Sequence, residues 1–403
     1  MTHPRKKNPA MLPPDRIRVV RIIARLNIGG PSLHVVNLNK GLSSDRFESR
    51  LVIGSSNPGE GSMLDYAEEN GIHPLVVPEM VGEASLRPRD MKALRKLFRL
   101  IVDERPHIVH THTAKAGFLG RLAARLARVP IIIHTYHGHV LDGYYGFLRN
   151  WLLQRLERGL ALTTDRIVAI SPLVKQDLLT YRIAPPEKIS VIPLGFDLEP
   201  FFQCGSLKGE FRRELGIDPG TSLVGILGRI FPIKNHYLFL ESAARVAEQE
   251  SNVRFVIVGD GVLRSNIETY AQNLGIRGQV IFTGWRRDLP RIYADLDVLV
   301  ISSNNEGTPV SAIEALASGC PVVATRVGGL PDIVRNDETG YLVPAKQPQA
   351  LARAILKLIV NPQRAEQMGR SGQLYVRETF SMNRLVTDTE NLYEELLASK
   401  KLL

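Results

Sequence analysis

The chain has 403 residues, 44% of them hydrophobic, which is long for one core of ordinary size and enough for two domains. Lysine and arginine outnumber aspartate and glutamate by 51 to 41, and the formal charge of +10 favours an anionic partner such as a nucleotide, a membrane surface or a nucleic acid. Nucleic acid is the weakest of these, because only 6% of the residues are aromatic and no helix-turn-helix or zinc-knuckle spacing occurs.

The N-terminus is polar and contains several prolines before the first expected strand. We interpret residues 1–15 as a flexible tail and not as a signal peptide. The sequence holds no run of about 18 to 20 apolar residues of the kind that spans a membrane. Cys204 and Cys320 match no metal or redox spacing, which predicts two reduced thiols in a cytosolic protein.

Strands and helices alternate along the rest of the chain, which is typical of parallel sheets with helices on both faces. The expected strands are 17–25, 50–54, 73–77, 107–111, 131–136, 166–170 and 190–193, then 222–228, 253–259, 279–283, 298–302, 321–325 and 340–343. Proline, glycine and cysteine interrupt the alternation at Pro193–Ser206. The sequence therefore predicts an α/β protein with two doubly wound, Rossmann-like domains, residues 16–200 and 201–380, and a cleft between them.

A glycine-containing loop, Asn27–Ser32, follows the first strand. Its spacing is not GxGxxG, so it carries no dinucleotide fingerprint. Two interpretations fit equally well: an ordinary strand-to-helix turn, or a place where a phosphate approaches the backbone at Gly29 and Gly30. Pro31 suits a first helical position.

The segment Arg89–Val102 predicts a basic amphipathic helix. Four cations lie on one face and four large apolar side chains on the other. Such a helix packs its apolar face on a sheet or docks on anionic lipid, and the first alternative is the more common.

Six of the ten histidines fall between His107 and His139. His110 and His112 share one face of a strand by the period-two rule. A zinc site of this kind usually includes aspartate, glutamate or cysteine at tight spacing, so we expect no metal here. His112 and Lys115, at the end of that strand, suit an acceptor's phosphate or, equally, a purely structural role.

A cationic turn begins the second half, where an apolar strand ends in Gly228, Arg229 follows, and Lys234 stands at the next helix start. A strand, a glycine turn and two cations at the carboxyl end of a sheet predict a polyanion site. Solvated surface cations beside a turn are the alternative.

The most informative segment is Glu306–Thr325, where two carboxylates, Glu306 and Glu314, stand eight positions apart around a Gly-Thr-Pro turn. Free amides at a helix start suit hydroxyl or phosphate oxygens. Glu314, expected about two turns into the helix, suits a vicinal diol. A simply capped helix is the alternative.

Asp295-Leu296-Asp297 spells DxD, a triplet whose two carboxylates can bind a metal ion. Here it stands between a helix and the strand at 298–302. We therefore interpret it as local structure.

Together these segments resemble the retaining glycosyltransferases of family 4, in the branch that builds bacterial surface polysaccharides. The resemblance covers nearly the whole chain and is carried by Gly228-Arg229-x4-Lys234, Glu306-x7-Glu314, Val191–Phe201 and His110–Arg125. It implies the GT-B fold, with a final helix at 381–403 that crosses back to the first domain. It also implies a cytoplasmic enzyme, peripheral at the membrane, without metal or cofactor.

The resemblance assigns roles to individual residues. The pyrophosphate would be held by Arg229 and Lys234, the ribose by Glu314 and the sugar by Glu306. The other expected donor contacts are Gly30, Trp285, Arg286, Gly307, Thr308, Pro309 and Val310. The expected catalytic set is His137, Arg229, Lys234 and Glu306, and Gly29, His112 and Lys115 would lie on the acceptor side. Thr308 stands where the family often has Phe or Tyr, which leaves the donor sugar open, and Asn235 replaces a frequent glycine.

The function that follows is metal-independent transfer of a hexosyl or N-acetylhexosaminyl group from a nucleotide-sugar, expected to be a UDP-sugar, to a hydroxyl of a lipid-linked saccharide. Two alternatives stay open. A non-hydrolysing UDP-sugar 2-epimerase shares this fold, and a non-catalytic sugar-nucleotide-binding protein would bind the donor without turnover.

Overall fold

The structure is a computed structural model that describes residues 16–27, 29–42, 45–55, 61–82, 87–138 and 147–402. The predicted tail at residues 1–15 and His139 lie outside these residues. The chain divides into two compact units, each described here by itself. Unit 1 comprises the chain up to Ala169 with Leu178–Ser190 and Val386–Leu403, and unit 2 comprises Ile170–Asp177 and Val191–Leu385.

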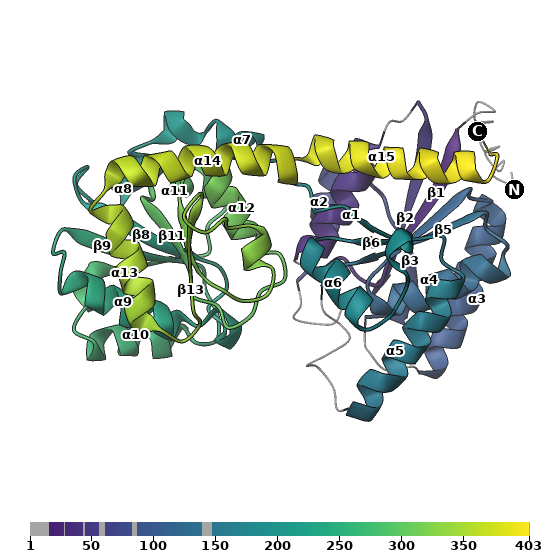
Figure 1. Ribbon diagram of the computed structural model, residues 1–403, viewed down its shortest axis with the longest axis horizontal. Coiled ribbons are helices and arrows are strands. Elements are labelled where there is room, and N and C mark those ends of the chain that lie inside the picture. Colours follow the sequence, from purple (N-terminus) through teal and green to yellow (C-terminus); the bar gives the residue numbers. More distant parts are fainter. Residues whose placement is uncertain are drawn as a thin grey trace, which may run out of the picture. The chain divides into compact units, whose positions relative to one another are not determined.

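Unit 1 contains a seven-stranded sheet (Figure 1). Its strands are β1 (Ile17–Ile23), β2 (Phe47–Ser55), β3 (Leu75–Val81), β4 (Ile108–His112), β5 (Ile131–Tyr136), β6 (Arg166–Ala169) and β7 (Ile189–Val191). Its helices are α1 (Gly30–Gly41), α2 (Leu64–Glu69), α3 (Pro88–Glu104), α4 (Ala114–Leu126), α5 (Phe147–Leu162) and most of α15 (Met382–Ser399). Helix α6 (Pro172–Thr180) is divided, with residues 172–177 in unit 2 and residues 178–180 in unit 1.

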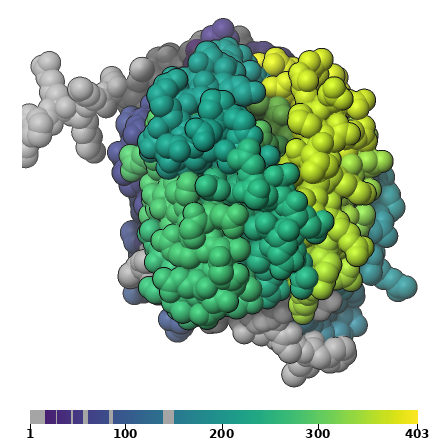
Figure 2. Space-filling view, turned by 90° about the vertical axis from the view of Figure 1, so that its left-hand side faces the viewer, coloured from purple at the N-terminus to yellow at the C-terminus, as the bar shows by residue number. Residues whose placement is uncertain are grey.

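Unit 2 contains a six-stranded sheet with helices on both faces (Figure 1). Its strands are β8 (Ser222–Leu227), β9 (Val253–Val258), β10 (Val280–Gly284), β11 (Val298–Ile301), β12 (Val322–Thr325) and β13 (Gly340–Val343). Its helices are α7 (Glu199–Phe202), α8 (Glu210–Glu214), α9 (His236–Ala247), α10 (Arg264–Asn273), α11 (Leu289–Asp295), α12 (Val310–Ala317), α13 (Pro348–Ile359) and α14 (Pro362–Phe380). Figure 2 shows one face of this unit, with α14 in yellow along its edge.

The predicted fold class is confirmed, because each unit is a parallel-sheet Rossmann-like domain. The strand orders are β3-β2-β1-β4-β5-β6-β7 and β10-β9-β8-β11-β12-β13. In both sheets the order reverses direction beside the first strand, which places the topological switch points at β1/β4 and β8/β11. Ligands of such sheets bind outside the carboxyl ends of the strands at these points. The candidate residues are therefore best sought in the loops that follow these four strands.

Burial explains why both sheets form. Every residue of β4 and β5 is buried, as expected for central parallel strands covered on both faces. In unit 2 the strands pack with α9, α10 and α13 into one apolar cluster that includes Phe239, Phe255 and Ile355. These cores hold the carboxyl ends of the strands in place.

Helix α3 packs its apolar face inside the protein, which is the more common of the two predicted alternatives. Ala93, Leu97 and Ile101 are buried in a core cluster with residues of β1, β2 and β4. Lys96 donates to Glu79 at 2.6 Å on the opposite, exposed side. The core thus occupies the apolar face, and the cations remain exposed.

A buried tyrosine fastens α15 to unit 1. Tyr393 Oη accepts a hydrogen bond from Arg21 Nη2 at 2.9 Å and lies 2.7 Å from His110 Nδ1. The other ring nitrogen of His110 lies 2.7 Å from Thr135 Oγ1. A helix from the far end of the chain therefore completes the hydrogen bonding of central strands. No helix in the described ranges is long and apolar enough to cross a membrane.

Candidate active site

The loop after β8 presents the two predicted cations at the switch point of unit 2. Gly228 has a φ of 145°, and a Cβ at the neighbouring Gly259 would stand 2.1 Å from the Gly228 carbonyl oxygen, so the two glycine backbones approach closely. Arg229 is exposed beyond this turn, with its guanidinium carbon 4.7 Å from the centre of the Phe231 ring. Lys234 ends a short 3-10 turn just before α9.

Backbone contacts hold the loop after β11 against this cationic turn. Asn304 N donates to the carbonyl oxygen of Ile233 at 2.8 Å. Ser302 Oγ lies 3.0 Å from the carbonyl oxygens of both Lys234 and Asn235. These contacts fix the two loops relative to each other.

Lys234 and Glu306 consequently form an ion pair at the switch point. Lys234 Nζ lies 2.6 Å from Glu306 Oε1, and their side chains are 27% and 10% exposed. Ser303 Oγ donates to the same carboxylate oxygen at 2.6 Å. Because an ammonium has three donors, Lys234 can bind a phosphate oxygen while it keeps this carboxylate.

Two glycines of the next loop support the Glu306 backbone. Gly329 N donates to the Glu306 carbonyl oxygen at 3.0 Å. A Cβ at Gly328, whose φ is 51°, would stand 1.8 Å from that oxygen, and one at Gly329 would stand 2.0 Å from the carbonyl oxygen of Gly307. Only glycine, which has no Cβ, permits this close approach. Gly307 itself is exposed to solvent.

Glu314 lies just over one turn into α12, not about two turns as expected, because the helix begins only at Val310. Tyr293 Oη donates to Glu314 Oε2 at 3.0 Å. Desolvation raises the pKa of Glu314 to about 7, although the hydrogen bond from Tyr293 lowers it. The residue as a whole nevertheless stays partly exposed. Protein atoms therefore desolvate the Glu314 carboxylate without enclosing the residue completely.

In unit 1, three histidines lie together at the other switch point. His112 is the last residue of β4, His137 follows β5 directly, and His34 lies one turn into α1. His112 Nδ1 and His137 Nε2 are 3.0 Å apart. Burial lowers the pKa of His137 to about 3 and that of His112 well below its usual value, so both rings are neutral at neutral pH.

Two family models match the two halves of the chain. One, Glycosyltransferase Family 4, matches residues 28–200, and the other, Glycosyl transferases group 1, matches residues 208–375. The UDP-Gal:alpha-D-GlcNAc-diphosphoundecaprenol alpha-1,3-galactosyltransferase of Escherichia coli is 30% identical over 363 residues, which cover 89% of this chain and 92% of the relative. The chain belongs to the GT-B glycosyltransferases.

Other similar proteins agree with this family. The capsular polysaccharide biosynthesis glycosyltransferase CapM of Staphylococcus aureus is 29% identical, over 76% of this chain and 82% of its own. Among solved structures, HepE of Anabaena in complex with UDP superposes with a TM-score of 0.81 at 21% identity and covers 94% of this chain and 100% of its own. This structural likeness supports the fold of the glycosyltransferase.

The structure distributes the predicted site residues of the glycosyltransferase over both units. Unit 2 brings together Arg229, Lys234, Glu306 and the residues up to Val310, while Gly29, Gly30, His112, Lys115 and His137 belong to unit 1. Lys115 is buried, and its ammonium lies 2.7 Å from Asp90 Oδ2. Its charge is thus matched inside unit 1.

The loop after β10 contains Trp285 and Arg286, two of the expected donor contacts. Trp285 is 67% exposed. Arg286 instead binds two carboxylates, those of Asp288 at 2.6 Å and Glu214 at 2.5 Å. The backbone of this loop, and not the guanidinium, is the part left for a ligand.

The interpretation of the DxD triplet as local structure is confirmed. Asp295 Oδ2 accepts from the backbone of Arg212 at 2.9 Å, and its other oxygen accepts from Gly209 N. Asp297 Oδ2 accepts from Arg212 Nη2 and from Leu223 N, both at 2.7 Å. Both carboxylates are therefore engaged with α8 and β8. The two cysteines are free thiols, as predicted, and both are buried.

Sequence reasoning missed three residues of these sites. His34 stands 78 positions before His112, Ser303 carries no motif, and Tyr293 lies in a different helix from its partner Glu314. A signal existed for His34 alone, because a side chain one turn after the glycine loop of β1 faces the same sheet edge as the end of β4.

Proposed function

We propose that this glycosyltransferase moves a hexosyl or N-acetylhexosaminyl group from a UDP-sugar to a hydroxyl of a lipid-linked saccharide, with retention of anomeric configuration and without a metal. The observation that carries the proposal is the Lys234–Glu306 pair at the β8/β11 switch point, with the desolvated Glu314 one helix turn further on. The name of the E. coli relative supports the substrate classes, because it specifies UDP-galactose and a lipid diphosphate saccharide.

The donor is expected to bind unit 2 through complementary charges. The exposed guanidinium of Arg229 and the ammonium of Lys234 match a pyrophosphate. The Glu314 carboxylate, when ionised, accepts hydrogen bonds from two ribose hydroxyls. Glu306 and the backbone amides that follow it would bind and orient the sugar.

In the proposed reaction, the bond between the anomeric carbon and the UDP oxygen breaks while the acceptor oxygen bonds to that carbon on the same face. The acceptor proton passes to the departing phosphate oxygen. Arg229, Lys234 and helix N-termini stabilise the negative charge that develops on the leaving group. No side chain needs to form a covalent intermediate.

His137 is the proposed catalytic imidazole on the acceptor side. Burial lowers its pKa to about 3, so it acts as a neutral hydrogen-bonding group and not as a cation. A neutral ring has one donor and one acceptor nitrogen, either of which can orient a sugar hydroxyl.

We also propose that the enzyme works in the cytoplasm and meets a lipid-linked acceptor at the membrane surface. The exposed cations of α3 support an electrostatic contact with anionic lipid. Because the core occupies the apolar face of α3, this contact would not include insertion of that face.

A panel of nucleotide-sugars tests the proposal. With a lipid-diphosphate-linked GlcNAc acceptor, one UDP-sugar should release UDP and yield an elongated saccharide whose linkage is read by NMR. Conversion of the UDP-sugar to an epimer without acceptor would instead identify an epimerase. Tight binding of UDP-sugars without any product would identify a binding protein.

A further inference from the structure

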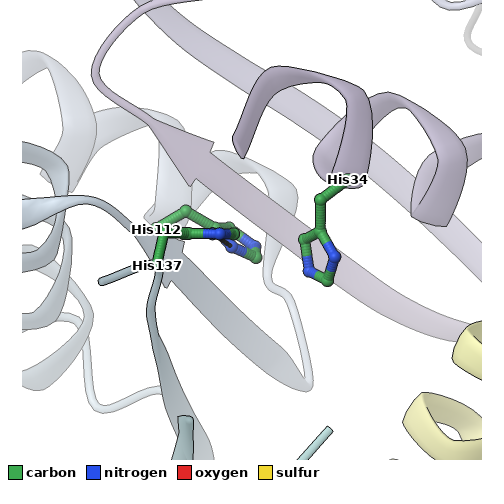
Figure 3. Close-up of side chains that lie close together, drawn as sticks. All are labelled: His34, His112 and His137. Carbon is green, nitrogen blue, oxygen red and sulfur yellow. Dashed lines mark hydrogen bonds between the residues drawn. The ribbon is translucent and has the colours of Figure 1, made fainter. Parts of the chain in front are cut away.

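The three histidines of unit 1 come together through topology alone. His34 and His137 follow β1 and β5, and His112 ends β4; the carboxyl ends of these three strands meet at one edge of the parallel sheet. Figure 3 shows the rings of His112 and His137 side by side, with His34 facing them from α1. His34 and His112 are buried and His137 is partly buried. The cluster is therefore a property of the fold and not of one sequence motif.

The ring spacings match those of three imidazoles around one ion. The ring centroids are 5.6 Å apart for His34 and His112, 5.0 Å for His34 and His137, and 5.3 Å for His112 and His137. With zinc–nitrogen bonds of about 2.0 to 2.1 Å and tetrahedral angles, ring centroids lie about 5.2 Å apart. One nitrogen of each ring lies within 4.8 Å of the others, whereas bound nitrogens lie about 3.3 Å apart. Side-chain rotations that bring the nitrogens closer by up to about 1.5 Å would complete such a site.

Neighbouring histidines differ from His112 and His137 in their hydrogen bonding. Both ring nitrogens of His110 have hydrogen-bond partners, and Nδ1 of His134 lies 2.8 Å from Thr111 Oγ1. In contrast, His112 Nε2 and His137 Nδ1 are buried without a hydrogen-bond partner among the described residues. His110 stacks on His112 with ring centroids 4.4 Å apart and so helps to fix the orientation of that ring.

We propose that His34, His112 and His137 form a site for a divalent late transition metal, with Zn²⁺ as the best fit. Three imidazole ligands suit zinc, copper or nickel and do not suit the oxygen-seeking Mg²⁺ or Ca²⁺. The ion would replace the proton shared by His112 Nδ1 and His137 Nε2. Three protein ligands leave a fourth position open to water or another small donor.

Cobalt is the probe for this site, because four-coordinate Co²⁺ absorbs visible light far more strongly than the hydrated ion. Metal-free protein without a polyhistidine tag is titrated with Co²⁺ and then with Zn²⁺. We expect strong visible bands that saturate at one cobalt per chain and disappear as zinc displaces it. The variant His34→Ala should weaken cobalt binding by at least about 100-fold, because loss of even an outer-shell partner of a metal ligand costs 10- to 100-fold.

The control is His73→Ala, which removes an exposed histidine of the same unit and should bind cobalt like the wild type. If His34→Ala does not fold, as judged by circular dichroism, His34→Gln repeats the test with a side chain of similar length. X-ray absorption of the zinc-loaded wild type counts its imidazole ligands independently of any variant. Absence of strong visible bands at millimolar cobalt, equal affinity in the His34 variant and wild type, or fewer than three imidazole ligands would each overturn the proposal.

Discussion

Replacing Lys234 by alanine is expected to slow sugar transfer far more than it destabilises the fold. Loss of one stabiliser of developing charge costs about 2.7 to 4 kcal/mol, a factor of 10² to 10³ in rate. The ion pair with Glu306 is intermediate in burial. An exposed ion pair contributes about 0 to 1 kcal/mol to the free energy of unfolding, and removing one partner of a buried pair costs about 3 to 5 kcal/mol. Because Ser303 still donates to Glu306, we expect about 1 to 2 kcal/mol of destabilisation.

Initial rates of UDP release at saturating donor and the thermal midpoint Tm separate the two effects. The expected destabilisation corresponds to a fall of roughly 2 to 8 °C in Tm for a domain of this size. Lys208→Ala, which removes an exposed lysine of the same unit, is the matched control. The double variant Lys234→Ala, Glu306→Gln should regain Tm, because no unpaired carboxylate remains, yet stay slow. Transfer within threefold of wild type in Lys234→Ala would refute the pyrophosphate assignment.

Three further predictions concern other residues. The pKa of Glu314 is raised from its ordinary value of 4.5 to about 7, so its contribution to stability is present below pH 4.5 and lost as the pH rises through 7. Glu314→Gln should therefore resist urea better than the wild type at pH 8 but not near pH 4.5, and lower stability of the variant at pH 8 would contradict this. The same substitution should weaken UDP binding by about 1 to 3 kcal/mol. Transfer should persist in excess EDTA and slow when Zn²⁺ occupies His137, whereas loss in EDTA with rescue by Mn²⁺ would contradict metal independence. Binding to anionic vesicles should weaken by about 1 kcal/mol per cation when four exposed cations of α3 are changed to glutamine, and equal sedimentation of wild type and variant would reject the membrane contact. Those cations are Lys92, Arg95, Lys96 and Arg99.

The positions of the strands along the chain could be predicted because central parallel strands are continuous apolar runs. All thirteen expected strands are present, and β5 and β13 have the expected bounds. One edge strand was less well predicted: the strand expected at 73–77 is β3, Leu75–Val81. Its extension pairs Val81 with Ser55 beyond an irregularity in the register, which local sequence does not encode.

The chemistry of the site could be predicted only where one loop supplies it. Glu306 and Glu314 share a segment, whereas the partner of Lys234 comes from 72 residues away and is selected by the switch point of the sheet. Lys115 illustrates the opposite case, because its place beside Asp90 depends on how α3 packs on α4. Pairings between elements depend on strand order, and a sequence pattern does not give strand order.

The hydrogen bonds of Tyr393 bear on the order in which the chain can fold during synthesis. Arg21 and His110 lie in the first strands to leave the ribosome, but their buried partner is made only after all of unit 2. Until then unit 1 holds two buried polar groups without their native partner, and each such group costs about 1 to 3 kcal/mol. Domains usually fold in the order of their synthesis. Here the N-terminal unit reaches its final stability last, and a chain that ends before α15 would leave it incomplete while unit 2 keeps its own core.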